Sequence, residues 1–422
     1  MLPEVLFTGW FAFPEGSAGA QYVYGLGKAL RAGGHTAGYV VDGSVGRDQD
    51  RVGDGDYAFD GFPYYPLGIR NKPGRFQRIF PSMGGHLDLT LEWLRSQDLR
   101  GVKHIVTYSG SCGYLIKLRA FCRTRGITLS NIVVEWYSLS QYAPWSLRRR
   151  MQVLMDCELQ RRIVNRLIGN LVCISRFLHQ HYSRRGCFSL LVPHVLDLND
   201  GKWPKPTAPR DDTAGINLVY AGSGGRHDLV HNAILGLALL GDKGKAVKLT
   251  LCGPSRDVVA SFLGRDRRVL DRLHGQLNFR GLLPHRGALA EVAQADFSIL
   301  LRPEIKCTRA GFPTKLGESL ACGTPILGNL TGDVGLYVTD EVEGILVPDC
   351  RPESFAQGLA RTLSMPTAAR QAMRARARNR AAVSLDFRNY GPVMHEFVVH
   401  LERHVTAVRV AIKPITTIPA AP

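Results

Sequence analysis

The chain has 422 residues, of which 45% are hydrophobic and 21% are charged, a composition typical of a globular protein. No run of about 18 apolar residues is present, which excludes a membrane-spanning helix. The formal net charge of +17 favours nucleic acids, anionic membrane surfaces or phosphorylated ligands as partners. The length exceeds what one ordinary core supports, so we expect two domains of roughly 200 residues each.

The amino terminus and the cysteines indicate where the chain works. Residues 5–13 are typical of a first strand and its loop rather than of a signal peptide, so we expect a cytoplasmic protein. The nine cysteines lie at least ten positions apart and form no CxxC pair, which argues against a disulfide framework or a zinc ribbon. We therefore expect free thiols and no bound metal.

Short apolar runs alternate with helical patterns through the first half of the chain. The expected strands are residues 3–10, 37–41, 103–109, 129–136 and 170–175, and the expected helices include residues 21–36 and 113–126. A Gly-rich loop, EGSAGA (15–20), follows the first strand. This alternation predicts an α/β domain with a doubly wound parallel sheet over residues 1–196.

A second alternating series follows a segment rich in Pro, Asp and Gly, residues 197–215, which we interpret as a linker. The expected strands of the second domain, 216–386, are residues 216–222, 247–253, 277–281, 295–301, 325–329 and 344–348. Residues 387–408 have the pattern of a long amphipathic helix, and we predict a disordered tail over 411–422.

The motif AGFPTKLGE (310–318) follows a predicted buried strand. Gly311 allows a sharp bend, and Pro313 suits the first position of a helix. Helix openings leave N–H groups unpaired and carry partial positive charge, so anions bind there readily. Thr314 and Lys315 add a hydroxyl and an ammonium, and the motif therefore predicts a diphosphate site.

Glu318 lies about one turn further into the same helix. It is four residues after Thr314, whereas a capping box needs a spacing of three. A carboxylate can accept hydrogen bonds from the two vicinal hydroxyls of a ribose, so Glu318 indicates a nucleotide. The alternative is an exposed Lys315–Glu318 pair, worth only about 0.2–0.5 kcal/mol.

Two further glycine loops follow predicted strands, EGSAGA (15–20) and the loop within LVYAGSGGRHD (218–228). In the second loop, Arg226 can pair with two phosphate oxygens, and His227 follows it. Either loop alone is better explained as an ordinary strand–helix turn. Three such loops at the carboxyl ends of strands indicate a ligand at that edge of the sheet.

These motifs, together with LVCISRFLHQHY (171–182) and VPHVLD (192–197), resemble the GT-B glycosyltransferases of family 4. The resemblance implies two Rossmann-like domains facing a cleft, of which the amino-terminal one takes the acceptor and the carboxyl-terminal one the nucleotide-sugar donor. It also implies that the last helix, 387–410, crosses back to the first domain. The expected reaction is transfer of a sugar from UDP or GDP to an acceptor hydroxyl with retention of configuration and without a metal.

The resemblance also assigns roles to residues. Glu318 resembles the second Glu of the family's E-x7-E motif, which holds the ribose, and Arg226 and Lys315 neutralise the leaving phosphate, so these three are the expected catalytic residues. The loop 331–334 falls where the family lines its cleft. The full expected donor-binding set is Gly19, Ala20, Gly222, Ser223, Arg226, His227, Gly311, Phe312, Pro313, Thr314, Lys315 and Glu318.

One position departs from the family pattern. The first Glu of E-x7-E falls on Ala310, which cannot accept a hydrogen bond, so the donor sugar is left open. Glu304 and Arg309 are near in sequence, but nothing places them in the site. No general base is assigned, because Glu135 is a candidate only through its place at the end of a strand.

A basic and aromatic stretch lies in the expected acceptor domain. Residues 141–190 contain nine arginines against two acids. An anionic membrane surface or a lipid-linked acceptor would suit a surface formed by Trp136, Tyr142, Trp145, Arg148, Arg149 and Arg150. The equally weighted alternative is a solvated helical face with its aromatic rings in the core.

The leading hypothesis is a glycosyltransferase that builds a cell-surface polysaccharide or glycoconjugate on the cytoplasmic side of the membrane. A nucleotide-sugar epimerase of the same fold is the runner-up, and the cleft motifs contain few of the acids that its chemistry needs. A nucleic-acid-binding protein is disfavoured because no recognised module appears. An inactive GT-B scaffold remains an alternative because of Ala310.

Overall fold

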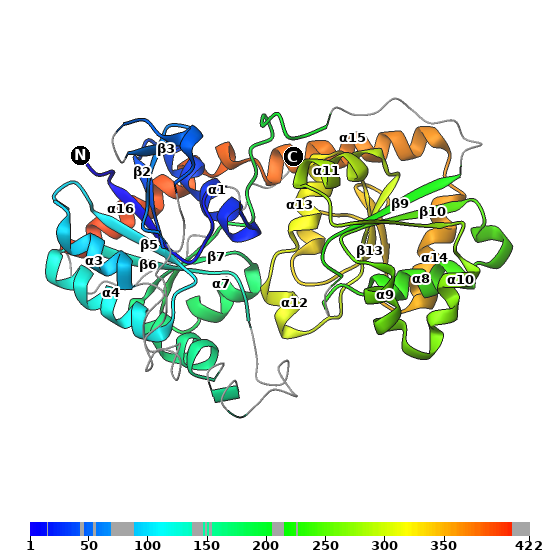
Figure 1. The fold of residues 1–422 in the computed structure, drawn as a ribbon, viewed down its shortest axis with the longest axis horizontal. Helices are drawn as coiled ribbons and strands as arrows, with labels where there is room; N and C mark the ends of the chain where they lie inside the picture. The colour runs from blue at the N-terminus through cyan, green and yellow to red at the C-terminus, as the bar shows by residue number, and fades with distance from the viewer. Residues whose placement is uncertain are drawn as a thin grey trace. The chain divides into compact units, whose positions relative to one another are not determined.

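The computed structural model describes residues 1–14, 16–42, 46–53, 56–68, 88–136, 147, 150–151, 154–204, 215–224 and 227–406. The chain divides into two compact units (Figure 1). The first unit comprises Met1–Leu196 together with the segment that begins at Phe387, and the second comprises Asp197–Asp386.

An eight-stranded sheet forms the centre of the first unit, in the order β3-β4-β2-β1-β5-β6-β7-β8. Its strands are β1 (Val5–Gly9), β2 (Ala37–Val41), β3 (Tyr57–Phe59), β4 (Phe62–Pro66), β5 (His104–Tyr108), β6 (Thr128–Val133), β7 (Asn170–Cys173) and β8 (Phe188–Leu191). Neighbouring strands are parallel except at one edge, where β3 and β4 pair antiparallel.

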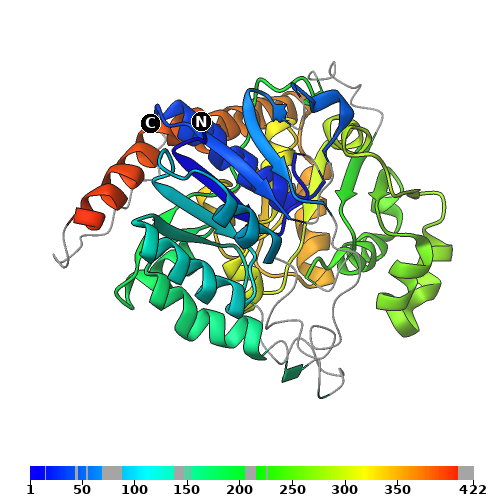
Figure 2. The same ribbon diagram turned by 60° about the vertical axis from the view of Figure 1, so that its left-hand side comes forward.

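Helices cover both faces of this sheet. They are α1 (Ala18–Ala32), α3 (Asp88–Ser96), α4 (Cys112–Arg125), α6 (Asn165–Ile168), α7 (Arg176–Ser183) and α16 (Gly391–Thr406), with a π-helix η4 (Leu154–Val164) and the 3-10 helices η1 (Asp48–Asp50) and η9 (Phe387–Tyr390). Successive side chains of β1 point to opposite faces of the sheet. Leu6 packs towards α3 and α4, whereas Val5 and Phe7 pack towards α1 and α16. Figures 1 and 2 show α1 and α16 packed side by side.

The carboxyl-terminal helix α16 begins tightly against the end of α1. A side chain on Gly33 would place its Cβ 2.6 Å from the carbonyl oxygen of Gly391, and Gly391 faces the Ala32 backbone in the same way. Further along α16, the His395 ring lies 3.1 Å from His35, nitrogen to nitrogen. The helix is therefore an integral part of the first unit, although more than 300 residues separate it from α1 in the chain.

A six-stranded sheet forms the centre of the second unit, with all strands parallel in the order β11-β10-β9-β12-β13-β14. The strands are β9 (Ile216–Ala221), β10 (Val247–Cys252), β11 (Leu277–Gly281), β12 (Phe297–Leu300), β13 (Ile326–Asn329) and β14 (Gly344–Val347). The order reverses direction between β9 and β12. In a doubly wound sheet, ligands bind at the carboxyl ends of the strands near such a reversal.

The helices of the second unit also form two layers (Figure 1). They are α8 (Val230–Leu239), α9 (Arg256–Leu263), α10 (Val269–Arg272), α11 (His285–Gln294), α12 (Lys306–Ala310), α13 (Thr314–Ala321), α14 (Pro352–Leu363) and α15 (Thr367–Ser384), with the 3-10 helices η6 (Gly241–Gly244), η7 (Gly264–Arg268) and η8 (Val334–Leu336). Helices α8 and α14 pack together, as do α13 and α15. Buried Leu, Ile and Val side chains from α8, α14 and the sheet form the main core of this unit.

The predicted α/β class with two parallel-sheet domains is confirmed. The strands β3, β4 and β8 and the π-helix were not predicted from the sequence. The first helix begins at Ala18 rather than at residue 21, because Ser17 caps it by accepting a hydrogen bond from Ala20 N at 3.1 Å. Most of the predicted linker and the whole predicted tail lie outside the described residues. Within the described residues, no helix has both the length and the apolar character needed to cross a membrane.

Candidate functional site

An ion pair joins the start of α13 to the loop after β9. The Lys315 Nζ donates a hydrogen bond to Asp228 Oδ2, and the same ammonium lies 5.0 Å from the centre of the Tyr220 ring. Both charged side chains are more than four-fifths buried. The pair is therefore held in a partly desolvated environment, where charge interactions are stronger than at an open surface.

A second cation approaches the same carboxylate from the end of β12. Arg302 Nε lies 3.6 Å from Asp228 Oδ1, and the Arg302 side chain is only 13% exposed. Its backbone is fixed by Asn329, which accepts from Arg302 N and donates to Arg302 O, both at 2.9 Å. Two buried guanidinium nitrogens, Nε and Nη1, make no hydrogen bond to any residue that the structure describes. Buried Arg nitrogens without acceptors favour an anionic ligand here.

The protonation state of Asp228 follows from these neighbours. Burial works against its charged form, but Lys315 and Arg302 outweigh burial and hold the pKa of Asp228 below its ordinary value. Burial lowers the pKa of Arg302, and an Arg side chain stays charged at neutral pH in spite of such a shift. Two cations thus share one carboxylate, and the three side chains together are net positive.

Tyr220 orders the loop that carries Asp228. Its hydroxyl donates to Asp228 Oδ2 at 3.2 Å and accepts from Gly224 N at 3.0 Å. Burial, together with the charge of Asp228, raises the pKa of Tyr220 far above its ordinary value, so the phenol stays protonated. The side chain therefore connects the strand to its own loop.

Gly222 makes room for Lys315. A Cβ at this position would lie 2.3 Å from Lys315 Cε and 2.7 Å from Nζ. Its neighbour on the adjacent strand, Gly253, has φ of +114° and approaches Gly222 O closely, so glycine is required at Gly253. The glycine at position 222 therefore leaves space for the Lys315 side chain, which crosses the backbone there.

Glu318 pairs with a residue that the sequence analysis did not single out. Its Oε1 lies 2.8 Å from Nε2 of His285, the first residue of α11. Lys315 and Glu318, the two members of the alternative surface pair, each have a partner in another element. The Glu318 side chain is 19% exposed, so it remains accessible beside the start of α13.

The backbone around the start of α13 differs in detail from the expectation. Gly311 has φ of −86°, an extended value open to any residue, so it is not needed for a sharp bend. Pro313 precedes the helix, whose first residue is Thr314. The Phe312 ring is buried against Tyr337, with 5.4 Å between ring centres, so a ligand would meet the backbone of Phe312 rather than its ring.

Ala310 is completely buried at the end of α12. Glu304 and Arg309 form a surface pair at 3.3 Å, with both side chains about half exposed. Neither of these two residues replaces the carboxylate that is missing at Ala310, because their side chains pair with each other at the surface.

The remaining predicted donor residues are dispersed. Arg226 lies outside the described residues, whereas Ser223 is exposed and His227 Nε2 lies 3.8 Å from Cys307 Sγ. Gly19 and Ala20 belong to the first unit. Gly19 faces the Tyr108 hydroxyl, which would be 2.4 Å from an added Cβ, and Ala20 is fully buried. The Ala20 N–H already donates to Ser17, so a donor contact through Ala20 is not supported.

The prediction that Trp136 belongs to a membrane-facing surface is wrong. This side chain is buried, with its ring edge-on to His181 at 4.7 Å and covered by the Arg161 guanidinium at 3.9 Å. It is a core residue, as the alternative interpretation had it. Arg150 is exposed, and the other members of the set, Tyr142, Trp145, Arg148 and Arg149, lie outside the described residues.

Four residues of the site were missed from sequence: Tyr220, Asp228, His285 and Arg302. Asp228 and Arg302 each follow a predicted strand within a few residues, and that position was the available signal. His285 had no signal, because its link to Glu318 depends on how α11 and α13 pack.

Comparison with known proteins finds a family model that matches part of the second unit. Residues 211–380 match the family model described as "Glycosyl transferases group 1". A curated relative, D-inositol 3-phosphate glycosyltransferase of Salinispora tropica, is 43% identical over 65 residues. That match covers 15% of this chain and 13% of the relative, so the chain spans only a small part of the relative's length.

Solved structures match nearly the whole chain at low identity. Sucrose-phosphate synthase of Thermosynechococcus elongatus has a TM-score of 0.63 and 17% identity, covering 94% of this chain and 99% of its own. HepE of Anabaena in complex with UDP and glucose has a TM-score of 0.63 and 14% identity, covering 94% and 100%. WaaG, a glycosyltransferase involved in lipopolysaccharide biosynthesis, has 0.59 and 12%, covering 93% and 99%. These similarities confirm the predicted GT-B fold.

Proposed function

We propose that the protein transfers a sugar from a nucleoside-diphosphate sugar to an acceptor hydroxyl, because residues 211–380 match the group 1 glycosyltransferase family model. The transfer retains the configuration of the anomeric carbon. The second unit binds the donor, with the diphosphate at the start of α13 and the ribose at Glu318. The product belongs to a cell-surface polysaccharide or glycoconjugate.

One observation carries the proposal: two buried cations, Lys315 and Arg302, share the single carboxylate of Asp228. The N–H groups of the first turn of α13 add partial positive charge at the same place. A diphosphate brings the negative charge that this arrangement favours, and it would compete with Asp228 for the Lys315 ammonium. Arg302 offers two guanidinium nitrogens that lack acceptors among the described residues.

Glu318 supplies the nucleoside contact in this proposal. In the structure His285 holds its Oε1 at 2.8 Å, which orients the carboxylate beside the helix start. A carboxylate in this position can accept hydrogen bonds from both ribose hydroxyls. HepE, which shares the fold, is described in complex with UDP and glucose, so UDP is the first nucleotide to test, followed by GDP.

The chemical step needs charge neutralisation more than acid–base catalysis. When the bond from the sugar to the diphosphate breaks, negative charge develops on the leaving phosphate. Lys315 and Arg302 stabilise that charge, an electrostatic effect that is usually the largest contribution to catalysis. The leaving phosphate takes the proton of the acceptor hydroxyl, so no protein base is required. These cations perform the role that a metal ion would otherwise have.

The donor sugar and the acceptor are open parts of the proposal. Ala310 is buried and has no carboxylate to bind a sugar hydroxyl, so other residues must select the donor sugar. A lipid-linked acceptor at the inner face of the membrane stays a proposal that rests on exposed Arg150, since Trp136 is a core residue.

The proposal is tested by incubating the protein with UDP- and GDP-linked hexoses and measuring release of nucleoside diphosphate. We expect slow release from one donor, with water as the acceptor, and loss of release in Glu318→Ala. A matched control is Glu304→Ala, which removes a nearby surface carboxylate and should leave the rate unchanged. NMR of the sugar product then reports whether the configuration is retained. Release from neither donor, or equal release in Glu318→Ala and wild type, would refute the proposed site.

A further inference from the structure

Three potential metal ligands meet in the first unit, at the edge of its sheet opposite to the carboxyl ends of the strands. They are Glu4, just before β1, His104, the first residue of β5, and Glu402 in α16. One ligand atom from each residue lies within 4.8 Å of the others. The three residues come from segments that are distant in the chain.

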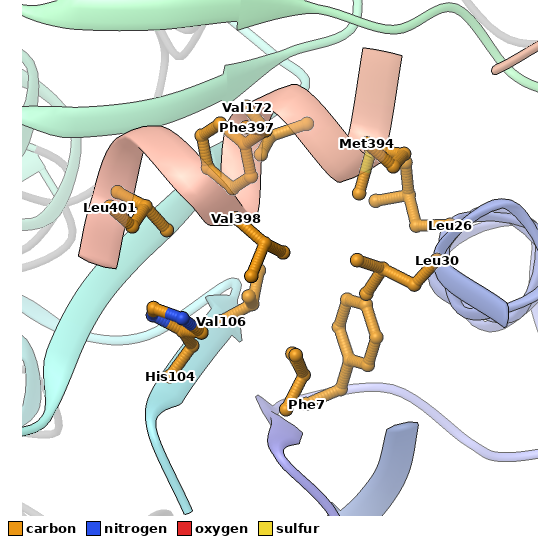
Figure 3. A pocket seen from close by; sticks show the side chains of 11 residues that line it. Phe7, Leu26, Leu30, His104, Val106, Val172, Met394, Phe397, Val398 and Leu401 are labelled. Atoms are coloured by element: carbon orange, nitrogen blue, oxygen red, sulfur yellow. The ribbon is translucent and has the colours of Figure 1, made fainter. Parts of the chain in front are cut away.

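His104 is the unusual member of this group. The residue is 1% exposed, and within the described part of the chain neither ring nitrogen makes a hydrogen bond. Alternation along β5 places His104 and Val106 on the α16 face of the sheet, where Leu and Val would be ordinary. Figure 3 shows the ring in the lining of a small apolar cavity, together with Val398 and Leu401 of α16. The volume of this cavity is about 10 Å³.

A buried imidazole whose nitrogens have no hydrogen-bond partner lowers the stability of the fold unless a ligand binds it. The cavity has room for about one water molecule and offers no second polar side chain to hold it, so hydration does not explain the residue. Burial lowers the pKa of His104 to about 4, so the ring is neutral at physiological pH. A neutral imidazole is the form that binds a metal ion.

The two carboxylates already share a cation. Lys103 Nζ lies 3.1 Å from Glu4 and 2.6 Å from Glu402, and its side chain is 57% exposed. His35 Nδ1 lies 2.9 Å from the other oxygen of Glu4 and orients that carboxylate. An exposed Lys can swing into solvent, so its ammonium can be replaced by another cation at little cost.

We propose that Glu4, His104 and Glu402 bind a divalent transition-metal ion, of which Zn²⁺ is the best match. Zn²⁺ binds both imidazole nitrogens and carboxylate oxygens, and a water molecule would complete a four-coordinate site with these three ligands. The ion takes the place of the Lys103 ammonium, and His35 acts as the outer partner that fixes Glu4. By joining β1 and β5 to α16, it fastens the carboxyl-terminal helix to the sheet.

The test is a calorimetric titration of the full chain with Zn²⁺, with the shift in melting temperature measured in parallel. We expect one site per chain that depends on these residues, and no comparable binding of Mg²⁺, which prefers oxygen ligands. His104→Leu and Glu402→Gln should each weaken the affinity at least tenfold. Lys103→Gln should strengthen it several-fold, because the competing cation is gone.

Two controls keep the test decisive. Glu396→Gln changes an exposed carboxylate on the same helix and should have no effect on affinity. If His104→Leu fails to fold, the half-exposed Lys103 and the partly exposed Glu402 still report on the site. Absence of saturable Zn²⁺ binding would overturn the proposal. Equal affinity in the wild type, Lys103→Gln and Glu402→Gln would also overturn it, because the ion would then be held elsewhere.

Discussion

Lys315 and Asp228 are 87 residues apart in the chain, yet they form an ion pair at the carboxyl edge of the second sheet. Asp228 also faces Arg302, so one carboxylate balances two buried cations. This arrangement gives the structural reason for a lysine in the opening of α13. The ammonium is directed across Gly222 towards the loop after β9, rather than along its own helix.

Lys315→Met is expected to weaken nucleotide binding and to destabilise the second unit. A hydrogen bond to a charged group contributes about 1.5–3 kcal/mol, so affinity should fall at least tenfold. The free energy of unfolding should fall by about 2 kcal/mol, because Asp228 loses its closest partner. Urea denaturation and nucleotide titration measure the two effects.

The double variant Lys315→Met with Asp228→Asn separates these effects. Removing the charge of Asp228 relieves the loss of its Lys315 partner but leaves buried Arg302 without its carboxylate, so only part of the lost stability should return. Nucleotide binding should not return. Recovery of binding together with stability would mean that Lys315 acts only through the fold.

Gly222→Ala should impair nucleotide binding while preserving the fold. The new methyl group would displace the end of the Lys315 side chain, which is flexible and can move. Gly253→Ala is the contrasting variant, because its Cβ would lie 2.0 Å from the carbonyl oxygen of Gly222 at a φ of +114°. We expect Gly253→Ala to be strongly destabilised in thermal unfolding and Gly222→Ala to be close to wild type.

The stability of the second unit should depend on the ionisation of Asp228. Its pKa is held below the ordinary value in the folded state, whereas the unfolded chain has a pKa of about 3.9. The stabilising contribution is therefore complete above about pH 4 and is lost as pH falls through the folded pKa. Urea unfolding between pH 5 and pH 3 should show a smaller loss of stability in Asp228→Asn. An equal loss in both proteins would contradict the assigned shift.

Trp136→Ala should destabilise the first unit by about 3–5 kcal/mol, because a large buried side chain leaves a cavity. Its ring also loses the contact with the Arg161 guanidinium. The measurement is denaturant unfolding of the variant beside Arg150→Ala, which removes an exposed side chain and should stay within about 0.5 kcal/mol of wild type. If the stability of Trp136→Ala were unchanged, Trp136 would not be a core residue, and the predicted surface role would be supported.

The sheets were predictable because their signal is local. Apolar runs such as residues 216–222 and 247–253 are buried parallel strands, and they appear within one or two residues of the expected bounds. The β3–β4 hairpin was missed because β3 has only three residues and β4 contains Pro63 and Pro66, since proline is unusual in strands.

The site was predictable only in part. Lys315, Glu318 and Gly222 were found because a helix opening and a glycine loop leave marks in the sequence. Arg302 and His285 were not found, since their roles come from contacts between elements that are distant in the chain. Trp136 was misassigned for a similar reason: a Trp beside several arginines has the same composition whether it is exposed or covered by one of them.

The central claim is that α13 opens on a nucleoside-diphosphate site whose ribose contact is Glu318. The most direct test is a thermal-shift titration of wild type, Glu318→Ala and Glu304→Ala with UDP, GDP, ADP and CMP. Ligand at about 100 times its dissociation constant should add about 2.7 kcal/mol to stability. We predict that one nucleoside diphosphate raises the melting temperature of wild type and Glu304→Ala but not of Glu318→Ala. If no nucleotide shifts any of the three proteins, the phosphate site is wrong, and an inactive scaffold becomes the better account.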